Sequence, residues 1–357
     1  MIRLSSVIEQ VEADFMRQYG SQLLPSQHQA LTAIKACRNQ YSALMQVHCN
    51  DCHIDKFLPH SCGNRHCPHC QHHESQQWLE NQCQKQVPGN YFMVTFTLPK
   101  QLRSLFFQHQ RLAYSMLFDC AWNTLQTFSH NDKQLKGTPG AIAVLHTHSR
   151  VLAYHPHIHI VIPAAAIDKE RGLWREKTGR YLFNHKALAK VFRARLLEAL
   201  TLNKLKLPED CPRQWVVDCK SVGSGAKALI YLGRYLYRGV IQEKDIVSCK
   251  DGNVTFRYLD SKTKKYQHKT VTGVHFLRLV LQHVLPKGFR RARNYGFLHP
   301  NSKMLINLLT VIFRIDPSLF LKKVKTRQKL VCSNCGATMQ IIKTRIKRLA
   351  GQNTVPV

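Results

Sequence analysis

An extended apolar run carrying alternating histidines is the feature that most restricts how this chain can fold. The run reads Tyr154-His155-Pro156-His157-Ile158-His159-Ile160-Val161-Ile162-Pro163. In a β-strand, successive side chains point to opposite faces, so the histidines share one face and the isoleucines share the other. The run therefore predicts a strand whose apolar face packs into a core while its histidine face is available to a metal ion.

The segment before this run supplies a candidate third ligand. Imidazoles from His157 and His159 would leave positions on Mg²⁺ or Mn²⁺ open for a phosphate and water. Residues 141–146 also read as a strand, and the short polar connection predicts an antiparallel hairpin. Pairing about a turn centred near Leu152 brings His146 opposite the His157/His159 pair. We predict His146 as the third ligand, with His148 as the alternative. The simpler interpretation is that these histidines have only a structural role and bind no metal.

Two tyrosines lie one helical turn apart in Tyr231-Leu232-Gly233-Arg234-Tyr235. On a helix, residues i and i+4 are neighbours, so both hydroxyls could approach one metal-bound phosphate. A phenol needs a metal or a base to act as a nucleophile. Attack by Tyr231 or Tyr235 on DNA would leave a 5′-phosphotyrosine and a free 3′-hydroxyl. Arg234 and Arg238 favour a phosphate site, whereas two core tyrosines of an amphipathic helix are the alternative.

Cysteines cluster in Cys-x-x-Cys pairs, and their total of 13 is odd, which argues against full disulfide pairing. Cys49, Cys52, Cys67 and Cys70 form two such pairs with the spacing of a four-cysteine zinc ribbon. We predict one structural Zn²⁺ there.

Three further zinc-binding side chains lie near these pairs: Cys37, Cys62 and His66. Together with another histidine they predict a second zinc ion, against the alternative of buried cysteines and a surface histidine. Cys332 and Cys335 have the spacing of half a zinc site, but the sequence shows no partner pair for them.

Charge points to a polyanionic partner. The 52 Lys and Arg residues against 21 Asp and Glu give a net charge of +31, which favours nucleic acid over an anionic membrane or a merely solvated surface. Arg290, Arg291 and Arg293, with Phe289 and Tyr295, predict a DNA backbone and stacking patch, with a solvated basic loop as the alternative. No apolar segment approaches the about 20 residues that span a membrane, and no signal peptide is recognisable. We expect a cytoplasmic protein.

The order of expected elements predicts five regions. They are an N-terminal helical segment (1–36), a zinc-binding domain (37–88), a domain with the histidine pair and the tyrosine helix (89–242), a β-meander with a basic DNA-contact region (243–300), and a basic helical C-terminal region with a Cys-x-x-Cys (301–357). The fold class is α+β, with a central antiparallel sheet flanked by helices and an N-terminal zinc-ribbon module.

Six motifs together resemble one family of enzymes. They are SCGNRHCPHC (61–70), FMVTFTLP (92–99), AVLHT (143–147), HPHIH (155–159), YLGRY (231–235) and VLPKGF (284–289). They resemble the bacterial two-tyrosine rolling-circle transposases of the insertion sequence ninety-one family, within the His-hydrophobe-His (HUH) endonucleases. His148-Ser149-Arg150 departs from the Trp-Gly-Gln expected there.

The resemblance implies an N-terminal zinc-binding domain and a nuclease domain with a central antiparallel sheet. It also implies two activities, which are nicking of DNA with a divalent metal and strand transfer. The substrates would be single-stranded DNA at the element ends and target DNA, and the protein would be associated with the nucleoid. The family's metal histidines fall on His157 and His159, and its tyrosines on Tyr231 and Tyr235. A plasmid-type replication initiator or relaxase, and a non-catalytic zinc-dependent DNA-binding regulator, are the alternatives.

Overall fold

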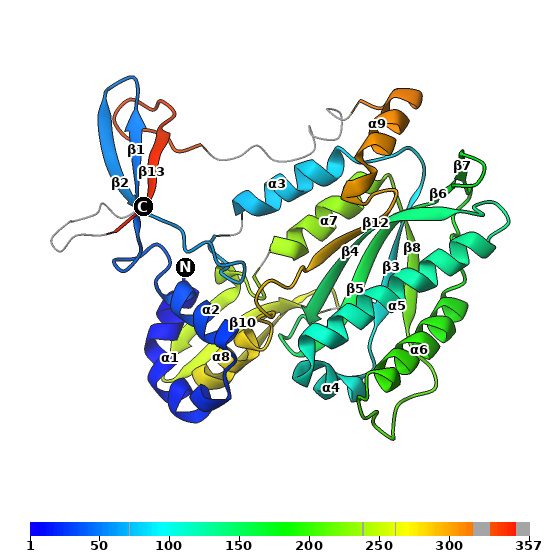
Figure 1. Ribbon diagram of the computed structural model, residues 1–357. Coiled ribbons are helices and arrows are strands. Elements are labelled where there is room, and N and C mark those ends of the chain that lie inside the picture. Colours follow the sequence, from blue (N-terminus) through cyan, green and yellow to red (C-terminus); the bar gives the residue numbers. More distant parts are fainter. Residues whose placement is uncertain (71, 238, 261, 317–328, 348–357) are drawn as a thin grey trace.

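The computed structural model describes residues 1–70, 72–237, 239–260, 262–316 and 329–347. Within these residues the chain forms a large antiparallel sheet flanked by helices, a smaller unit of helices and strands, and a separate three-stranded sheet (Figure 1). The predicted α+β fold with an antiparallel sheet is therefore confirmed. The helices of this described part include none long and apolar enough to cross a bilayer.

The large sheet carries the histidine run on a central strand. Its described strands follow the order β7-β6-β4-β5-β3-β8, with β12 also paired to β4, and every pairing is antiparallel. The strands are β3 (Tyr91–Thr97), β4 (Thr138–His148), β5 (Tyr154–Pro163), β6 (Ala165–Asp168), β7 (Leu173–Glu176), β8 (Val217–Gly223) and β12 (Ala292–Gly296). β4 and β5 form the hairpin that the sequence predicts.

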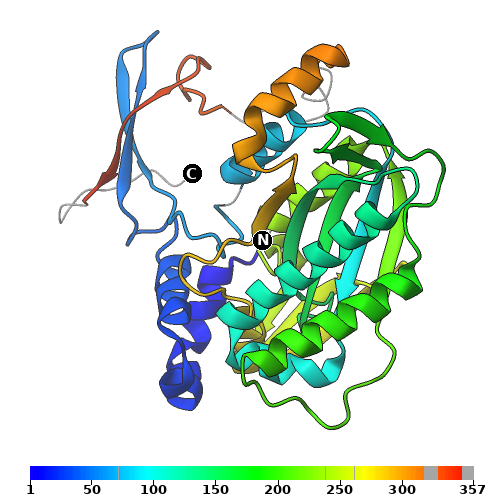
Figure 2. The same cartoon turned by 45° about the vertical axis from the view of Figure 1, so that its right-hand side comes forward.

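Helices cover both faces of this sheet (Figures 1 and 2). One face packs against α4 (Arg103–Gln108), α5 (Gln110–Asn131) and α6 (His185–Leu202), and the other against α3 (His72–Cys83), α7 (Gly225–Tyr237) and α9 (Lys303–Ile312). Alternation along β5 sorts the side chains: Ile158 and Ile160 enter the core with α5 and α6, whereas Val161 enters the core with α7. The histidine face of β5 is therefore the α7 face.

The N-terminal helices and the meander share one core, although they lie far apart in sequence. This unit contains α1 (Leu4–Tyr19), α2 (Pro25–Lys35), β9 (Ile246–Lys250), β10 (Asn253–Leu259), β11 (Tyr266–Thr272) and α8 (Gly273–Leu281). Val7 and Phe15 of α1 are buried in the same cluster as Phe256 and Phe276. The Leu4 amide also donates to Glu243 Oε1 at 3.1 Å. The predicted meander is thus present, with the order β11-β10-β9.

A small sheet joins two distant parts of the sequence. β1 (Leu44–Cys49) pairs with β2 (Ile54–Pro59) on one side and with β13 (Gln340–Ile346) on the other. The prediction of a helical region after residue 301 is therefore wrong at β13, because backbone pairing with β1 gives this isoleucine-containing segment a partner that its sequence does not reveal. In the described part of that region, α9 is helical as expected.

Gly233 lies inside α7, where α7 packs against α3. A Cβ at this position would lie 3.4 Å from the Trp78 ring and 3.6 Å from Leu79, which is ordinary van der Waals contact. Because glycine inside a helix costs about 1 kcal/mol relative to alanine, we expect Gly233→Ala to raise the free energy of unfolding by about 0.5–1 kcal/mol. Urea denaturation followed by circular dichroism measures this change.

Gly225→Ala is the matched control in the same helix. Its Cβ would lie 2.8 Å from the ring of buried Tyr91, so this variant should lose stability. A loss of stability in Gly233→Ala equal to that in Gly225→Ala would contradict the packing described for α7.

Candidate active site and cysteine clusters

The β4–β5 hairpin brings three histidines to one face. Its register pairs His146 with His157 and Val144 with His159. Because paired residues and their second neighbours share a face, all three imidazoles lie on the α7 side. The hairpin turns near Leu152, which has a φ of 63°, at the position that the sequence predicts. Gln282 and His283 donate to the Leu152 carbonyl oxygen at 2.8 and 2.9 Å and hold this turn.

One ring nitrogen from each of these three histidines lies within 4.8 Å of the others. The His146 and His159 ring centroids are 4.5 Å apart, and the His157 and His159 centroids are 4.9 Å apart. His157 Nδ1 is 2.7 Å from the His155 carbonyl oxygen, and His159 Nδ1 is 2.9 Å from Thr95 Oγ1. These outer partners orient both rings and leave Nε2 of each for a ligand. The donor set therefore fits a divalent ion with open positions.

Burial keeps the three imidazoles in the form that binds metal. Burial, followed by the repulsion that a protonated His157 would exert, lowers the pKa of His159 to about 3. Burial holds the pKa of His157 below its ordinary 6.5 and the pKa of His146 well below that value. All three rings are accordingly neutral at neutral pH, and each has a lone pair to offer.

His148 and His155 lie outside this group of three. The His148 ring lies 5.6 Å from the ring of His283, and Arg103 donates to Nδ1 of His155. Of the two candidates for the third position, the structure brings only His146 into the group.

Tyr231 lies beside the histidines. Its ring is 6.1 Å from the His159 ring, nearly perpendicular at 88°. The α7 residues Leu229 and Leu232 are buried against the sheet while Tyr231 keeps 38% of its surface exposed. An amphipathic helix thus carries one tyrosine to the edge of the histidine face.

Three other predicted residues cannot be placed. Tyr235 and Arg234 belong to α7, one turn or less beyond Tyr231, but their side chains lie outside the described part of the structure. Arg238 lies wholly outside the described residues.

A cleft of about 620 Å³ opens beside the histidines and Tyr231. Residues of the meander unit also line it, among them the basic and aromatic residues Lys244, Arg257, Tyr258 and Tyr266 and the carboxylates Asp245 and Asp260. The Arg257 guanidinium lies 5.1 Å from the centre of the Tyr266 ring and pairs with Asp245 at 3.0 Å. The cleft is therefore lined by the three histidines together with basic, aromatic and acidic groups of the meander unit.

The basic run near residue 290 differs from the predicted DNA patch in part, because some of its side chains make contacts within the protein. Arg291 donates to the carbonyl oxygens of Leu145 and Leu236, both at 3.0 Å. Arg293 lies 4.4 Å from the centre of the Phe118 ring and pairs with Asp119 at 3.4 Å. Arg290 is exposed. The predicted DNA contact through Arg291 is therefore corrected to an internal, structural one, whereas Arg290 and the partly exposed Arg293 remain predicted DNA contacts.

The aromatic members of that predicted patch are also internal. Phe289 is buried with its ring 5.6 Å from the Tyr114 ring. Tyr295 stacks on Trp122, with ring centres 4.8 Å apart and an angle of 12° between the planes. Neither ring is presented for stacking on a base.

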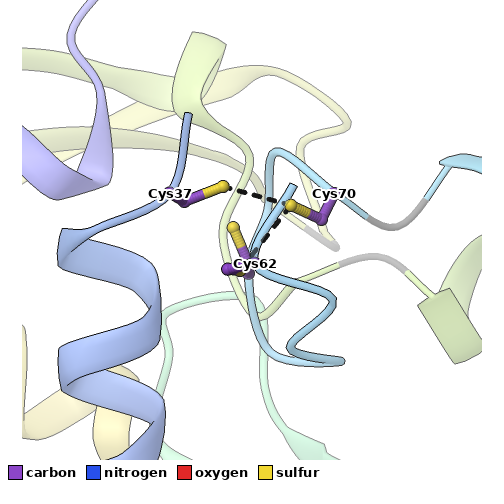
Figure 3. Close-up of side chains that lie close together, drawn as sticks. Cys37, Cys62 and Cys70 are labelled. Carbon is purple, nitrogen blue, oxygen red and sulfur yellow. Dashed lines mark hydrogen bonds between the residues drawn. The ribbon is translucent and has the colours of Figure 1, made fainter. Parts of the chain in front are cut away.

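One group of four cysteines, the base cluster, lies where the β1–β2 hairpin joins the rest of the chain. It consists of Cys37, Cys62, Cys67 and Cys70. The Sγ atoms of Cys37 and Cys70 are 3.1 Å apart, and those of Cys62 and Cys70 are 3.6 Å apart, with the thiols pointing toward one another (Figure 3). Four converging thiols match a closed structural zinc site.

A second group, the tip cluster, lies at the far end of the same hairpin. It consists of Cys49, Cys52, Cys332 and Cys335. The predicted grouping of Cys49 and Cys52 with Cys67 and Cys70 is therefore wrong. The six-residue strand β2 separates the two pairs, and at about 3.3 Å per residue this is roughly 20 Å.

His66 is not part of either cluster. Its Nε2 atom accepts a hydrogen bond from the Leu285 amide at 3.3 Å, and burial lowers its pKa to about 3. Its neighbour Arg65 donates to the carbonyl oxygens of Pro286 and Phe289. The VLPKGF motif thus receives the loop of the base cluster, which explains the motif in structural terms and corrects the prediction of His66 as a zinc ligand.

Comparison with known proteins places this chain in a family. A "Putative transposase y4qJ" of Sinorhizobium fredii is 32% identical over 316 residues, covering 80% of this chain and 79% of the relative. Residues 140–304 match the family described as "Putative transposase", and residues 7–98 match the "Transposase zinc-binding domain" of insertion sequence ninety-one elements. The chain belongs to the insertion sequence ninety-one family of transposases.

Two further comparisons, one with a sequence relative and one with a solved structure, differ in how far they support the assignment. The "Transposase for insertion sequence element IS801" of Pseudomonas savastanoi pv. phaseolicola is 27% identical, covering 76% of this chain and 70% of the relative. A solved bacterial tRNA(HIS) guanylyltransferase-like protein in complex with ATP matches 60% of this chain and 98% of its own at 14% identity, but its TM-score of 0.19 carries no argument about the fold. Transposases act on DNA, in agreement with the net charge of +31. The zinc-binding domain and the cysteine clusters support structural Zn²⁺.

The contacts of Arg291 in the transposase predict a structural role. Arg291→Met removes two charge-assisted donors and leaves the carbonyls of Leu145 and Leu236 without them. We expect the free energy of unfolding to fall by about 2–4 kcal/mol. Arg290→Met is the exposed control and should change stability by less than about 0.5 kcal/mol. If Arg291→Met weakened DNA binding without loss of stability in urea, the arginine would be a DNA contact after all.

Proposed function

We propose that this transposase nicks single-stranded DNA at the ends of its element through Tyr231 and Tyr235, and then transfers the strand in rolling-circle transposition. His146, His157 and His159 would hold Mg²⁺ or Mn²⁺. The observation that supports the proposal is the meeting of an exposed tyrosine with three neutral imidazoles in one cleft.

The covalent step uses the phenol oxygen as nucleophile. The Tyr231 oxygen attacks the phosphorus, the P–O bond to the 3′ oxygen breaks, and the leaving oxygen becomes a free 3′-hydroxyl after it takes up a proton. The chain keeps the 5′ end as a phosphotyrosine. When bound, the divalent ion would stabilise the phenolate and the charge that develops on the phosphate. Because the phosphodiester energy is retained, a later attack by a 3′-hydroxyl can rejoin the strand.

Two tyrosines allow two cleavages. Tyr235 follows Tyr231 by one helical turn in α7. One tyrosine can hold the first cut end while the other makes a second cut, which strand transfer requires. The relatives named as transposases favour this activity over replication initiation, which would use the same chemistry at an origin.

The meander wall of the cleft suits a single strand. Tyr258 and Tyr266 offer rings on which unpaired bases could stack, and Lys244 offers a charge for the backbone. A duplex would present no unstacked base to these rings. We therefore place the strand between the meander and the histidine face.

A covalent-adduct assay tests the proposed nucleophiles. Full-length protein is incubated with a labelled single-stranded element end and Mn²⁺, then separated under denaturing conditions. The wild type should form a labelled adduct, and Tyr231→Phe/Tyr235→Phe should form none. His157→Ala/His159→Ala should reduce the adduct by about 100-fold or more.

Tyr181→Phe is the matched control, because Tyr181 is exposed and lies outside the cleft. This variant should form the adduct at the wild-type level. An adduct that persists in the double tyrosine variant would refute Tyr231 and Tyr235 as nucleophiles.

Thr95 offers a test of the ring orientation. The Thr95 hydroxyl lies 2.9 Å from His159 Nδ1, and loss of such an outer partner weakens metal binding by about 10- to 100-fold. Thr95→Val should raise the Mn²⁺ concentration for half-maximal adduct formation by about 10-fold, whereas Thr95→Ser keeps the hydroxyl and should stay near wild type. Equal metal dependence in both variants would show that Thr95 does not orient His159.

A further inference from the structure

The small sheet of β1, β2 and β13 has almost no apolar core. Its buried cluster consists of Val47, Cys49, Cys332 and Met339. Six of the seven residues of β13 are exposed. Together, the two segments that build this sheet are shorter than about 40 residues. A domain of that size usually needs a disulfide, a metal or a partner to be stable. Backbone pairing between β13 and β1 is therefore not enough to hold residues 329–347 in place.

The tip cluster supplies the missing link between the two segments. The Sγ atoms of Cys49 and Cys335 are 3.4 Å apart, those of Cys52 and Cys332 are 3.5 Å apart, and those of Cys52 and Cys335 are 3.6 Å apart. Four sulfurs at about 2.3 Å around a tetrahedral ion lie roughly 3.8 Å from one another. The spacing is close to that of a tetrathiolate site and far from the about 2.05 Å of a disulfide bond.

The turns that carry these cysteines are alike. The residue after the second cysteine of each pair has a left-handed backbone, with φ of 54° at His53 and 76° at Gly336. In the second pair the Cys332 amide donates to the Ala337 carbonyl oxygen at 2.8 Å, and the Gly336 amide donates to the Cys332 carbonyl oxygen at 2.9 Å. Two tight turns, each offering two thiols to one point, are the arrangement of a zinc ribbon.

We propose that Cys49, Cys52, Cys332 and Cys335 bind one Zn²⁺, so that the ion fastens the C-terminal segment to the N-terminal hairpin. Cys332 and Cys335 lie outside the residues that match the transposase zinc-binding domain. The ribbon is therefore split, with the whole nuclease sheet between its two halves in sequence. Its ion holds β13 as the third strand, and with it the exposed basic residues Lys343 and Arg345.

Metal content of the full-length protein tests this proposal. All variants carry His157→Ala/His159→Ala, so that the histidine site adds no zinc to the count. This parent protein, purified under reducing conditions, should contain two zinc ions per chain by elemental mass spectrometry. Adding Cys332→Ser/Cys335→Ser should leave one zinc, and adding Cys62→Ser/Cys67→Ser should also leave one. Cys211→Ser/Cys249→Ser alters two cysteines outside both clusters and should retain two. One zinc in the parent, two after Cys332→Ser/Cys335→Ser, or iron in place of zinc would overturn the proposal.

Alkylation of the wild-type protein gives an answer that does not depend on how the variants fold. In the zinc-loaded protein the four cysteines of the tip cluster should react slowly with iodoacetamide, and a chelator should expose them together. In Cys332→Ser/Cys335→Ser, Cys49 and Cys52 should become reactive while the base cluster stays protected. Rapid alkylation of Cys332 and Cys335 in the zinc-loaded wild type would refute the shared site.

Discussion

The pairing register of β4 with β5 is the constraint on which the candidate site depends. With His146 opposite His157 and Val144 opposite His159, a slip of one residue would turn His157 and His159 toward α5 and bring Ile158 and Ile160 into the cleft. Burial of each isoleucine contributes about 1.5–3 kcal/mol, so the apolar face resists such a slip. The hydrophobic side of the hairpin, rather than the histidines themselves, therefore fixes where the imidazoles point.

Polar contacts from distant parts of the sequence hold the turn end of this hairpin. Gln282 and His283 donate to the turn at Leu152, and Arg291 joins β4 to the last turn of α7. Arg65, from the loop of the base cluster, donates to the carbonyls of Pro286 and Phe289 just before Arg291. The segment 284–291 thus links a structural zinc loop, the histidine hairpin and the tyrosine helix. The base cluster contributes to the geometry of the site even though it lies outside the cleft.

The residues that sequence could place are those governed by local periodicity. Alternation predicted the common face of His157 and His159, and the short connection predicted the position of His146. Cysteine spacing predicted the zinc ligands less well. A Cys-x-x-Cys pair indicates a local turn that offers two thiols, but it does not indicate which other pair completes the site. Residues 54–59, which form β2 between Cys52 and Cys67, read Ile-Asp-Lys-Phe-Leu-Pro and give only a weak strand signal, so the sequence offers little to show that the pairs lie at opposite ends of a hairpin. Arginines were misjudged for a related reason: the sequence does not distinguish a guanidinium that binds DNA from one that binds buried carbonyls.

Ligand chemistry separates the metal sites of one chain. Closed sets of four thiols favour Zn²⁺ and leave no position for substrate. Three neutral imidazoles would by affinity alone also favour Zn²⁺ over Mn²⁺ or Mg²⁺. What distinguishes the histidine site is its open side toward a cleft, because the remaining positions there would be filled by phosphate and water oxygens, the ligands that hard cations prefer. Under the proposed function, the choice of ion at this site would be governed by the substrate as well as by the protein, and metal selection would be coupled to the arrival of a DNA strand.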